Sequence, residues 1–373
     1  MSEWEPELEE LKFRESLAEK MGGSEKVERQ NERGKLNIRE RIALLLDKDS
    51  FHEIGKIAGK ATYDENGELL DLQASNFIFG RGRIDDRTVV IAGDDFTVRG
   101  GAADASIITK QVAAEQMANE LNLPIIRLID GTGGGGSVKT LDPNEHSKGS
   151  ISANTYGRGA RTYVPLNPGW EYVISNLATV PTVSLCLGPV AGLGAARAVS
   201  SHYSVMVKDL SQLFVAGPPV VNALGIEEVD KESLGGSQIQ TRNGSIDDEV
   251  ESEEEAFAAA RKFLSYLPSS TFENSEKLST EDSTSRTDPN LNDIIPRDRR
   301  KVYRMRNIIE SVFDVHSFFE MSSSFGRSAI TGLARLDGWP VAVLAGDPYH
   351  YGGGWTADAA QKVVRFVDLA ETF

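Results

Sequence analysis

Cysteine is almost absent from this sequence. The single cysteine, Cys186, lies in the apolar run at residues 183–187, so the chain can form neither a disulfide framework nor a cysteine-based metal site. We expect Cys186 to be a buried strand residue. The five histidines are scattered without metal-ligand spacing, and we expect each to be a structural or surface residue rather than a catalytic one.

Long apolar runs and an excess of basic residues are also missing. No stretch approaches the roughly 18 apolar residues that a membrane span needs, and the N-terminus is acidic rather than an apolar signal. The chain has 40 basic and 56 acidic residues, for a net charge of −16. This charge argues against a nucleic-acid partner. We expect no membrane partner and a cytoplasmic location, with the mitochondrial matrix left open.

The length of 373 residues favours two domains. Residues 268–296 are rich in Ser, Thr, Glu, Asn and Pro and carry no apolar periodicity, which predicts a linker. We therefore expect an N-terminal domain at residues 1–267, the linker at 268–296, and the beginning of a second domain at 297–373.

Strand and helix patterns alternate along the first domain. Helices are expected at 3–21, 38–46, 103–121, 170–178, 191–201 and 256–267, and strands at 77–84, 88–92, 124–129, 182–187 and 204–208. Such alternation predicts an α/β domain with a largely parallel sheet.

The residues beyond the linker repeat the beginning of the first domain. At one constant offset, Ile42, Asp47, Ser50, Phe51 and Glu53 recur as Ile309, Asp314, Ser317, Phe318 and Glu320. Ala-Gly-Asp at 92–94 returns at 345–347, and Gly-Gly at 100–101 returns at 353–354. This order favours an internal duplication. Since the second copy reaches only Phe373, we expect it to lack counterparts of residues 124–260.

Two glycine-rich segments follow predicted strands. Residues 130–137 read Asp-Gly-Thr-Gly-Gly-Gly-Gly-Ser, but Val138 precedes Lys139 where a nucleotide phosphate loop needs Gly, so that interpretation fails; a flexible loop stays open. Residues 187–196 run from a strand through a small-residue turn into a helix. Such a turn can point backbone N–H groups at an oxygen that gains negative charge, although close packing of strand on helix would use the same residues.

Three further segments accompany these two, and together they form an ordered set. They are residues 33–42, the run 95–98 before Gly100-Gly101, and residues 214–221 followed by 234–236. With this set, the chain resembles the carboxyltransferase (β) subunits of biotin-dependent acyl-CoA carboxylases, of the propionyl-CoA and methylcrotonoyl-CoA type, over essentially its whole length. The resemblance implies an α/β, crotonase-like fold, a spiral of ββα units in which the first half is complete and the homologous second half is truncated.

The resemblance also implies an activity. In the family, a carboxyl group moves from carboxybiotin, carried by a biotin carboxylase or biotin carboxyl carrier subunit, to the α-carbon of an acyl-CoA through a thioester enolate. No metal is implied at this site. Homo-oligomers are expected, with active sites between the N-terminal half of one protomer and the C-terminal half of another.

The site residues are carried over by the same resemblance. Gly192, Leu193 and Gly194 match the backbone oxyanion turn, with Leu193 where the family has a second adjacent glycine. The expected substrate-binding residues are Thr132, Gly133 and Gly134, in the place of a Ser-Gly-Gly loop, together with Phe96, Thr97, Gly217 and Pro218. Arg33, Lys35 and Arg39 are candidates for the CoA phosphates, or they form a solvated helix face.

Other functions remain open at the level of the sequence. A biotin-dependent acyl-CoA decarboxylase would share the turn. A crotonase-type hydratase would need a pair of aimed carboxylates, for which Asp130 and Glu171 are weak candidates. A truncated, non-catalytic relative that binds acyl-CoA or serves as a scaffold is the alternative from outside the enzymes.

Overall fold

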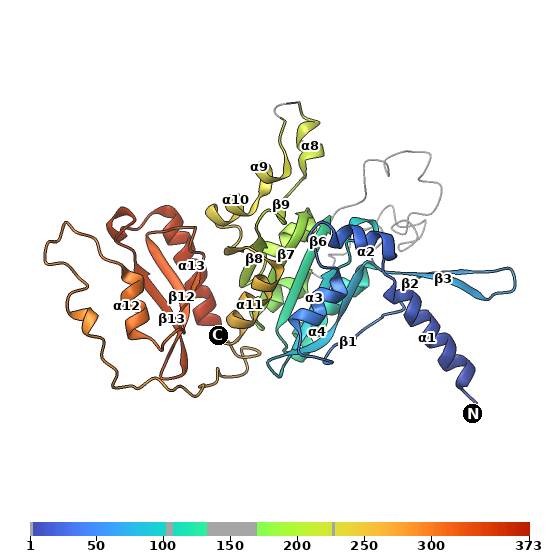
Figure 1. The fold of residues 1–373 in the computed structure, drawn as a ribbon, viewed down its shortest axis with the longest axis horizontal. Coiled ribbons are helices and arrows are strands. Elements are labelled where there is room, and N and C mark those ends of the chain that lie inside the picture. The colour runs from blue at the N-terminus through green and yellow to red at the C-terminus, as the bar shows by residue number, and fades with distance from the viewer. Residues whose placement is uncertain (1–2, 102–106, 133–169, 226–227) are drawn as a thin grey trace.

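The computed structural model describes residues 3–101, 107–132, 170–225 and 228–373. In Figure 1 these residues form two α/β units, a larger one around an eight-stranded sheet and a smaller one, in orange and red, around a three-stranded sheet. Helix α1 and a two-stranded hairpin project from the larger unit.

The large sheet has the strand order β1-β4-β5-β6-β7-β8-β10, and β9 pairs with β7. Strands β1, β4 and β5 are antiparallel neighbours, whereas β5 to β8 are parallel. The strands are β1 (His52–Glu53), β4 (Phe77–Ile84), β5 (Arg87–Asp94), β6 (Ile125–Thr132), β7 (Thr182–Ala191), β8 (Tyr203–Val207), β9 (Gln212–Phe214) and β10 (Asp248–Val250).

Helices cover both faces of this sheet. Because successive strand residues point to opposite faces, Val89 and Ile91 of β5 pack in the core that holds α3 (Ile38–Leu45) and α11 (Glu253–Leu264). Val90 and Ala92 pack instead in the core of α4 (Ile108–Leu121). The strands therefore read as continuous apolar runs, as parallel strands buried on two sides do. Cys186 is fully buried, as expected.

The remaining elements of the larger unit lie around this frame. They are α1 (Glu5–Glu19), α2 (Ser24–Asn31), the hairpin of β2 (Gly59–Tyr63) and β3 (Leu69–Ala74), η1 (Arg99–Gly101), α6 (Trp170–Asn176), α7 (Leu193–Val199), α8 (Pro218–Asn222), α9 (Lys231–Gly235) and α10 (Ser237–Arg242). The sequence patterns identified α1, α3, α4, α6, α7 and α11 with small shifts of their ends. They missed α2 and the β2–β3 hairpin, because α2 has a single apolar residue and the hairpin is largely exposed.

The smaller unit consists of α12 (Met305–Val312), β11 (Phe319–Met321), β12 (Ala329–Leu336), β13 (Trp339–Gly346), η6 (Tyr351–Gly353) and α13 (Ala357–Thr372). Between α11 and α12 the structure holds one regular element, η5 (Pro289–Asn292). The division of the chain at residues 268–296 stays a prediction.

Hydrogen bonds confirm the duplication. The Asp47 carboxylate accepts the N–H groups of Asp85 and Asp86 at 3.1 and 2.9 Å. In the second unit, Asp314 accepts those of Asp337 and Gly338 at 2.9 and 2.7 Å. Each carboxylate thus holds the turn of the hairpin that follows its helix.

The same comparison corrects the alignment of the repeat by one residue. Phe77 pairs with Asp94 in the first hairpin, and Ala329 pairs with Gly346 in the second. Asp94 therefore corresponds to Gly346, and Asp347 corresponds to Asp95 rather than to Asp94. Likewise, the positive-φ pair Gly352-Gly353, not 353–354, matches Gly100-Gly101. The alignment at 92–94 was wrong because it followed identical letters instead of strand pairing.

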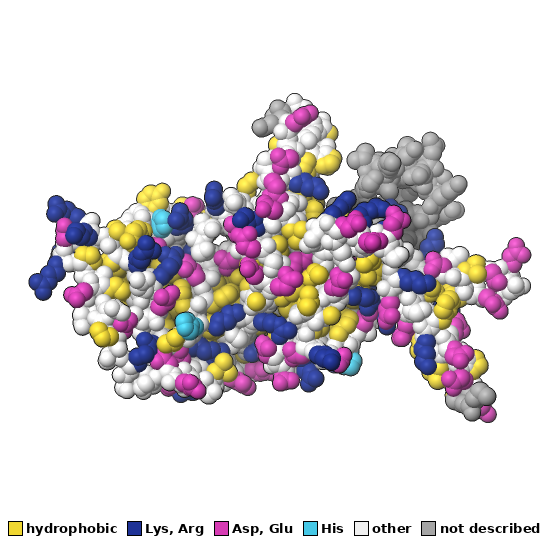
Figure 2. Space-filling model, viewed as in Figure 1, with side chains coloured by type: hydrophobic (Ala, Val, Ile, Leu, Met, Phe, Trp, Pro, Cys, Tyr) yellow, Lys and Arg dark blue, Asp and Glu magenta, His cyan; other side chains and the backbone are white. Residues whose placement is uncertain are grey.

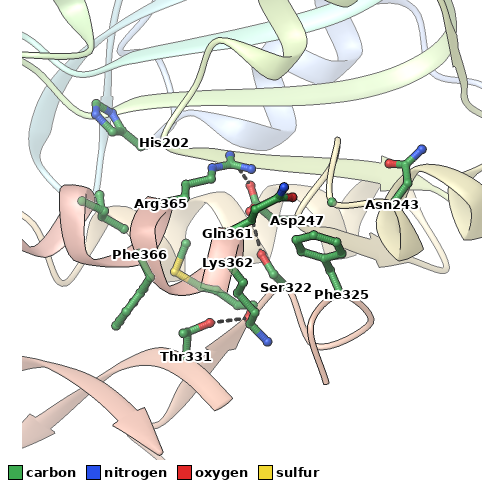
Figure 3. A pocket seen from close by; sticks show the side chains of 13 residues that line it. His202, Asn243, Asp247, Ser322, Phe325, Thr331, Gln361, Lys362, Arg365 and Phe366 are labelled. Atoms are coloured by element: carbon green, nitrogen blue, oxygen red, sulfur yellow. Dashed lines mark hydrogen bonds and ion pairs between the residues drawn. The ribbon is translucent and has the colours of Figure 1, made fainter. Parts of the chain in front are cut away.

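The two units share one hydrophobic core. Tyr203 and Phe263 of the first unit pack in the same cluster as Met321, Leu333 and Phe366 of the second. Figure 3 shows the polar side of this contact, where Arg365 of α13 and Ser322 both reach the buried Asp247 carboxylate, at 2.9 and 2.8 Å. Helix α13 is thus held by apolar packing and by a buried carboxylate.

A buried ionic cluster joins four elements of the larger unit. Arg41 of α3 binds Glu253 of α11 through two nitrogens, at 2.6 and 2.9 Å, and Asp130 of β6 at 2.8 Å. It also donates to the Leu187 carbonyl of β7 at 2.9 Å. Lys35 binds the Asp130 carboxylate at 2.7 Å. Arg41 and Asp130 are both 0% exposed, so each charge depends on its partners.

Replacing Arg41 by Met tests this dependence. The substitution leaves the Asp130 and Glu253 carboxylates buried without their shared cation, so we expect the free energy of unfolding to fall by about 3–5 kcal/mol. Urea denaturation measures the change. The control is Arg29→Met, which removes an exposed pair within one helix and should cost less than about 0.5 kcal/mol. A loss below about 1 kcal/mol for Arg41→Met would show that the cluster does not support the fold.

His202 adds a dependence of stability on pH. Its Nδ1 accepts the Thr182 N–H at 3.1 Å, and its Nε2 lies 2.9 Å from the Leu177 carbonyl, so the neutral ring satisfies both partners. Burial lowers the pKa of His202 to about 4, from 6.5. Between these pH values the unfolded chain binds more protons, so this contribution to stability rises with pH.

We therefore expect stability to be lost as the pH falls from 6.5 to 4, by at most roughly 3 kcal/mol from this group. Denaturation curves of the unsubstituted protein and of His202→Gln, measured at pH 7 and pH 4.5, should differ in this slope. His52→Gln, which changes an exposed ring, should keep it. An unchanged slope in His202→Gln would refute the assignment.

Candidate active site

The register of the parallel strands brings three expected segments together. Thr132, at the end of β6, pairs with Ala191, at the end of β7. Ala191 pairs in turn with Phe214, at the end of β9. Three segments therefore leave the same edge of the sheet. They are the segment that begins after Thr132, the turn at 192–194 and the segment that leads to Gly217. The carboxyl ends of parallel strands are where α/β proteins commonly place their ligand sites.

The turn itself has a specific backbone geometry. Gly192 has φ of 64° and ψ of −125°, a conformation that a side chain disfavours. Its N–H donates to the Phe214 carbonyl at 3.2 Å, so Gly192 is committed to the sheet. Leu193 and Gly194 begin α7, and no side chain caps this helix. The N–H groups that the turn can offer to a ligand are therefore those of Leu193 and Gly194.

The position of Leu193 explains how the turn accommodates a side chain. The positive φ falls on Gly192, whereas Leu193 is the first helical residue and its side chain is half exposed. A backbone donor at this position needs no glycine. The departure from two adjacent glycines therefore leaves both donors of the turn in place.

A basic cavity of about 460 Å³ lies beside this edge of the sheet. Pro189 of β7 and Gln212 of β9, which pair with each other, form one wall of it. Its other walls carry Phe96, Thr97, Gly100, Gln30, Asp209, Leu210 and the cationic residues Lys26, Arg29, Arg33, Lys35, Arg99 and Lys231. In a chain with a net charge of −16, such a concentration of cations favours an anionic ligand.

The structure gives Lys35 and Thr97 mainly positioning roles. The Lys35 ammonium lies 4.2 Å from the centre of the Phe96 ring and binds Asp130, and burial lowers its pKa. The Thr97 hydroxyl donates to Asp95 at 2.5 Å and accepts the Gly22 N–H at 2.9 Å. Both side chains thus shape the wall, whereas Arg33 is exposed and makes no ion pair within the part of the chain that the structure describes.

Other expected site residues lie elsewhere. Arg39 binds Glu53 at 2.9 and 3.4 Å and does not line the cavity. Gly217 and Pro218 begin α8, which projects from the body of the unit (Figure 1). Gly133 and Gly134 fall outside the described residues, and of Thr132 only the backbone is described.

Four cationic residues of the cavity, Lys26, Arg29, Arg99 and Lys231, were not expected from the sequence. Lys26 and Arg29 lie three residues apart in α2, which is the spacing of one helix face, and Arg33 follows just beyond the end of the helix. That spacing could have identified the face if α2 had been expected. Lys231 comes from α9, far along the chain, and no local signal points to it.

Two carboxylates lie behind the site. Asp94 accepts the Asp130 N–H at 3.2 Å, and burial raises the pKa of Asp94 to about 6. Asp130 is bound by Arg41 and Lys35.

Among the residues that the structure describes, no group of His, Cys, Asp or Glu is arranged to hold a metal ion, and no helix is long and apolar enough to span a membrane. The chemistry offered by the described site is that of backbone donors and cations.

Comparisons with known proteins agree with this geometry. The carboxyl transferase domain model matches residues 29–373. The propionyl-CoA carboxylase β chain of Roseobacter denitrificans is 31% identical over 98% of this chain and 68% of its own length. The methylmalonyl-CoA decarboxylase subunit α of Veillonella parvula is 29% identical over 94% of this chain and 65% of its own. The chain thus spans about two thirds of the length of these relatives.

Solved structures show the same fold. Transcarboxylase 12S, determined as a hexamer with methylmalonyl-coenzyme A and methylmalonic acid bound, superposes with a TM-score of 0.84 at 27% identity, over 100% of this chain and 69% of its own. This likeness confirms the α/β, crotonase-like fold expected from the sequence. By its strand order, its repeated hairpin unit and the match of the domain model over nearly its whole length, the chain belongs to the carboxyl transferase domain family.

Proposed function

We propose that this chain forms the acyl-CoA side of a carboxyltransferase site, at which a carboxyl group moves from carboxybiotin to the α-carbon of an acyl-CoA. The observation that carries the proposal is the convergence of Thr132, the turn at 192–194 and Phe214 on one sheet edge, next to a cavity lined by cations. The similarity to propionyl-CoA carboxylase β chains supports it.

The turn accounts for the difficult step. Removing a proton from the α-carbon places negative charge on the thioester oxygen, and donors that are already oriented stabilise that charge more than they stabilise the neutral carbonyl. The N–H groups of Leu193 and Gly194 are such donors. They are rigid because the Gly192 N–H is bound to β9 and because the ionic cluster below anchors β6 and β7. Carboxybiotin, delivered as a substrate, supplies the carboxyl group and, at its ureido nitrogen, a base.

The cavity accounts for recognition of the CoA portion. Arg33, Arg29, Lys26 and Lys231 present charges that suit the phosphates of CoA. Lys35 and Phe96, which contact each other, add a cationic and an apolar group to the same lining. Because the phosphates are remote from the reacting carbon, these residues should strengthen binding of CoA and acyl-CoA equally.

The partners follow from the same proposal. A biotin carboxylase or biotin carboxyl carrier subunit would deliver carboxybiotin, and the chain would act in a homo-oligomer whose sites lie between protomers. The hexamer of transcarboxylase 12S supports an oligomer. A decarboxylase that works on the same turn is the second candidate, favoured by the similarity to the methylmalonyl-CoA decarboxylase subunit. A scaffold that binds acyl-CoA without turnover is the third outcome that experiments must separate.

Leu193→Pro tests the backbone donor directly. Proline lacks the N–H and is tolerated at the first position of a helix, so the substitution removes one donor while α7 is retained. We expect propionyl-CoA to lose its affinity advantage over free CoA. In the assembled carboxylase, the turnover rate should fall by about 10²–10³-fold. Titration calorimetry and a carboxylation assay measure the two effects.

Leu193→Ala is the matched control, since it shortens the same side chain and keeps the N–H. It should retain both the affinity advantage and the turnover. Equal behaviour of the Pro and Ala variants, with both folded by circular dichroism, would eliminate the turn as an oxyanion site. Turnover of methylmalonyl-CoA without carboxylation of propionyl-CoA would favour the decarboxylase.

Arg33→Gln tests the cavity. Loss of one charge-assisted contact to a phosphate should weaken CoA and propionyl-CoA by the same factor, about tenfold at low salt. Arg300→Gln, which removes an exposed arginine beside Asp298 in the second unit, should change neither affinity. A selective effect on propionyl-CoA, or no effect, would place the CoA phosphates elsewhere.

A further inference from the structure

The second unit contains a cavity of its own, of about 470 Å³, at the beginning of α12. Its lining consists of Arg304, Arg306, Asn307, Glu310, Arg327, Asp347, Tyr349 and His350. These residues come from the start of α12, the turn before β12 and the segment after β13. The cavity is separate from the basic cavity of the first unit, with which it shares no residue.

The duplication shows what is distinctive about this position. In the first unit, Asn37 caps α3: its side chain accepts the N–H groups of Arg39 and Glu40, both at 3.0 Å, and Glu40 accepts the Asn37 N–H in return. In the second unit, Arg304 stands in the place of Asn37 and Asn307 in that of Glu40. Arginine has no acceptor, so α12 has no side-chain cap. The position that holds the capping Asn37 in the first unit therefore holds a cation, Arg304, in the second.

The charges in the cavity are not all compensated. Arg306 binds two carboxylates, those of Glu320 and Asp347, both at 2.6 Å, so its charge is fully compensated and this group of three side chains carries one net negative charge. The Arg306–Glu320 pair repeats the Arg39–Glu53 pair of the first unit. Arg304 and Arg327 make no ion pair with any residue that the structure describes, and Arg304 lies 5.6 Å from the centre of the Tyr349 ring. Glu310 is the other carboxylate in the lining and lies one helical turn or more from Arg304.

In the first unit, the chain covers part of the corresponding place. There, the connection between α1 and α2 packs on Thr97: the Gly22 N–H binds the Thr97 hydroxyl at 2.9 Å, and a Cβ at Gly22 would collide with the Thr97 carbonyl. In the second unit, Tyr349 occupies the position of Thr97, and its side chain is 52% exposed. The side chain of Tyr349 is therefore exposed, whereas the connection between α1 and α2 covers Thr97.

We propose that this cavity is a second anion site, which binds the phosphoryl group of a phosphorylated small molecule. The guanidinium groups of Arg304 and Arg327 would hold the oxygens, with the uncapped N–H groups of the first turn of α12 as additional donors. His350 and Tyr349 complete the wall. The site shares no residue with the turn or with the first cavity.

The test is calorimetric titration of the full chain with pyrophosphate and with inorganic phosphate, together with amide hydrogen exchange of the peptide that contains Met305 and Arg306. We expect saturable binding, with slower exchange in the first turn of α12. Arg304→Asn, which restores the cap used by α3, and Arg327→Gln should each weaken binding about tenfold. Arg304→Asn should fold at least as well as the unsubstituted chain.

Arg33→Gln distinguishes the two cavities, since it alters the first and should leave this binding event unchanged. Succinate serves as the carboxylate probe and should not compete. The proposal is overturned by the absence of phosphate binding, by binding that Arg33→Gln abolishes while Arg304→Asn retains it, or by equal binding of succinate. None of these outcomes decides whether propionyl-CoA binds at the turn, so the two proposals fail separately.

Discussion

The buried contact between Arg41 and Asp130 is the interaction on which the rest of the larger unit depends. Arg41 also binds Glu253 and the Leu187 carbonyl, so one guanidinium joins α3, α11, β6 and β7 below the turn. Asp130 lies where β6 approaches its carboxyl end, and it accepts Lys35 as well. A buried ionic cluster cannot shift without leaving a charge uncompensated. It therefore fixes the place from which the turn begins.

The close packing around this cluster restricts the residues of β7. A Cβ at Gly188 would collide with the Asp130 carboxylate and with the Lys35 ammonium. Gly188 is thus required by the ionic cluster, whereas Gly192 is required by its positive φ. Both glycines serve the same end, since backbone donors can favour a developing charge only if they need no rearrangement when it appears. The charges that anchor the strands and the backbone N–H groups of the turn are therefore parts of one arrangement.

Much of the fold could be predicted from the sequence. The hairpin, the strand-helix-strand unit and the turn after residue 187 carry clear apolar patterns and turn residues, and the duplication was visible from matched polar residues such as Asp47 and Asp314. The register of the Ala-Gly-Asp match was wrong by one residue, because identical letters do not report which strand residues pair. Helix α2 was missed since its sequence is almost entirely polar, and it supplies part of the cationic wall.

The candidate site could be predicted only in outline. The turn was found because its signal is local, but the commitment of the Gly192 N–H to Phe214 depends on β9, which is distant in sequence. The role of Lys35 as a partner of Asp130, and of Arg39 as a partner of Glu53, depends equally on contacts between distant segments. Local patterns identify residue types that can bind a phosphate. They do not show which of those residues the fold has already paired.

The most direct test of the central claim, that the turn polarises a thioester, is the infrared band of the thioester carbonyl in bound propionyl-CoA labelled with ¹³C at that carbon. The account predicts a band at lower frequency than in water, because two oriented N–H donors draw charge toward the oxygen. A bound thioester whose carbonyl absorbs at or above its frequency in water would contradict it.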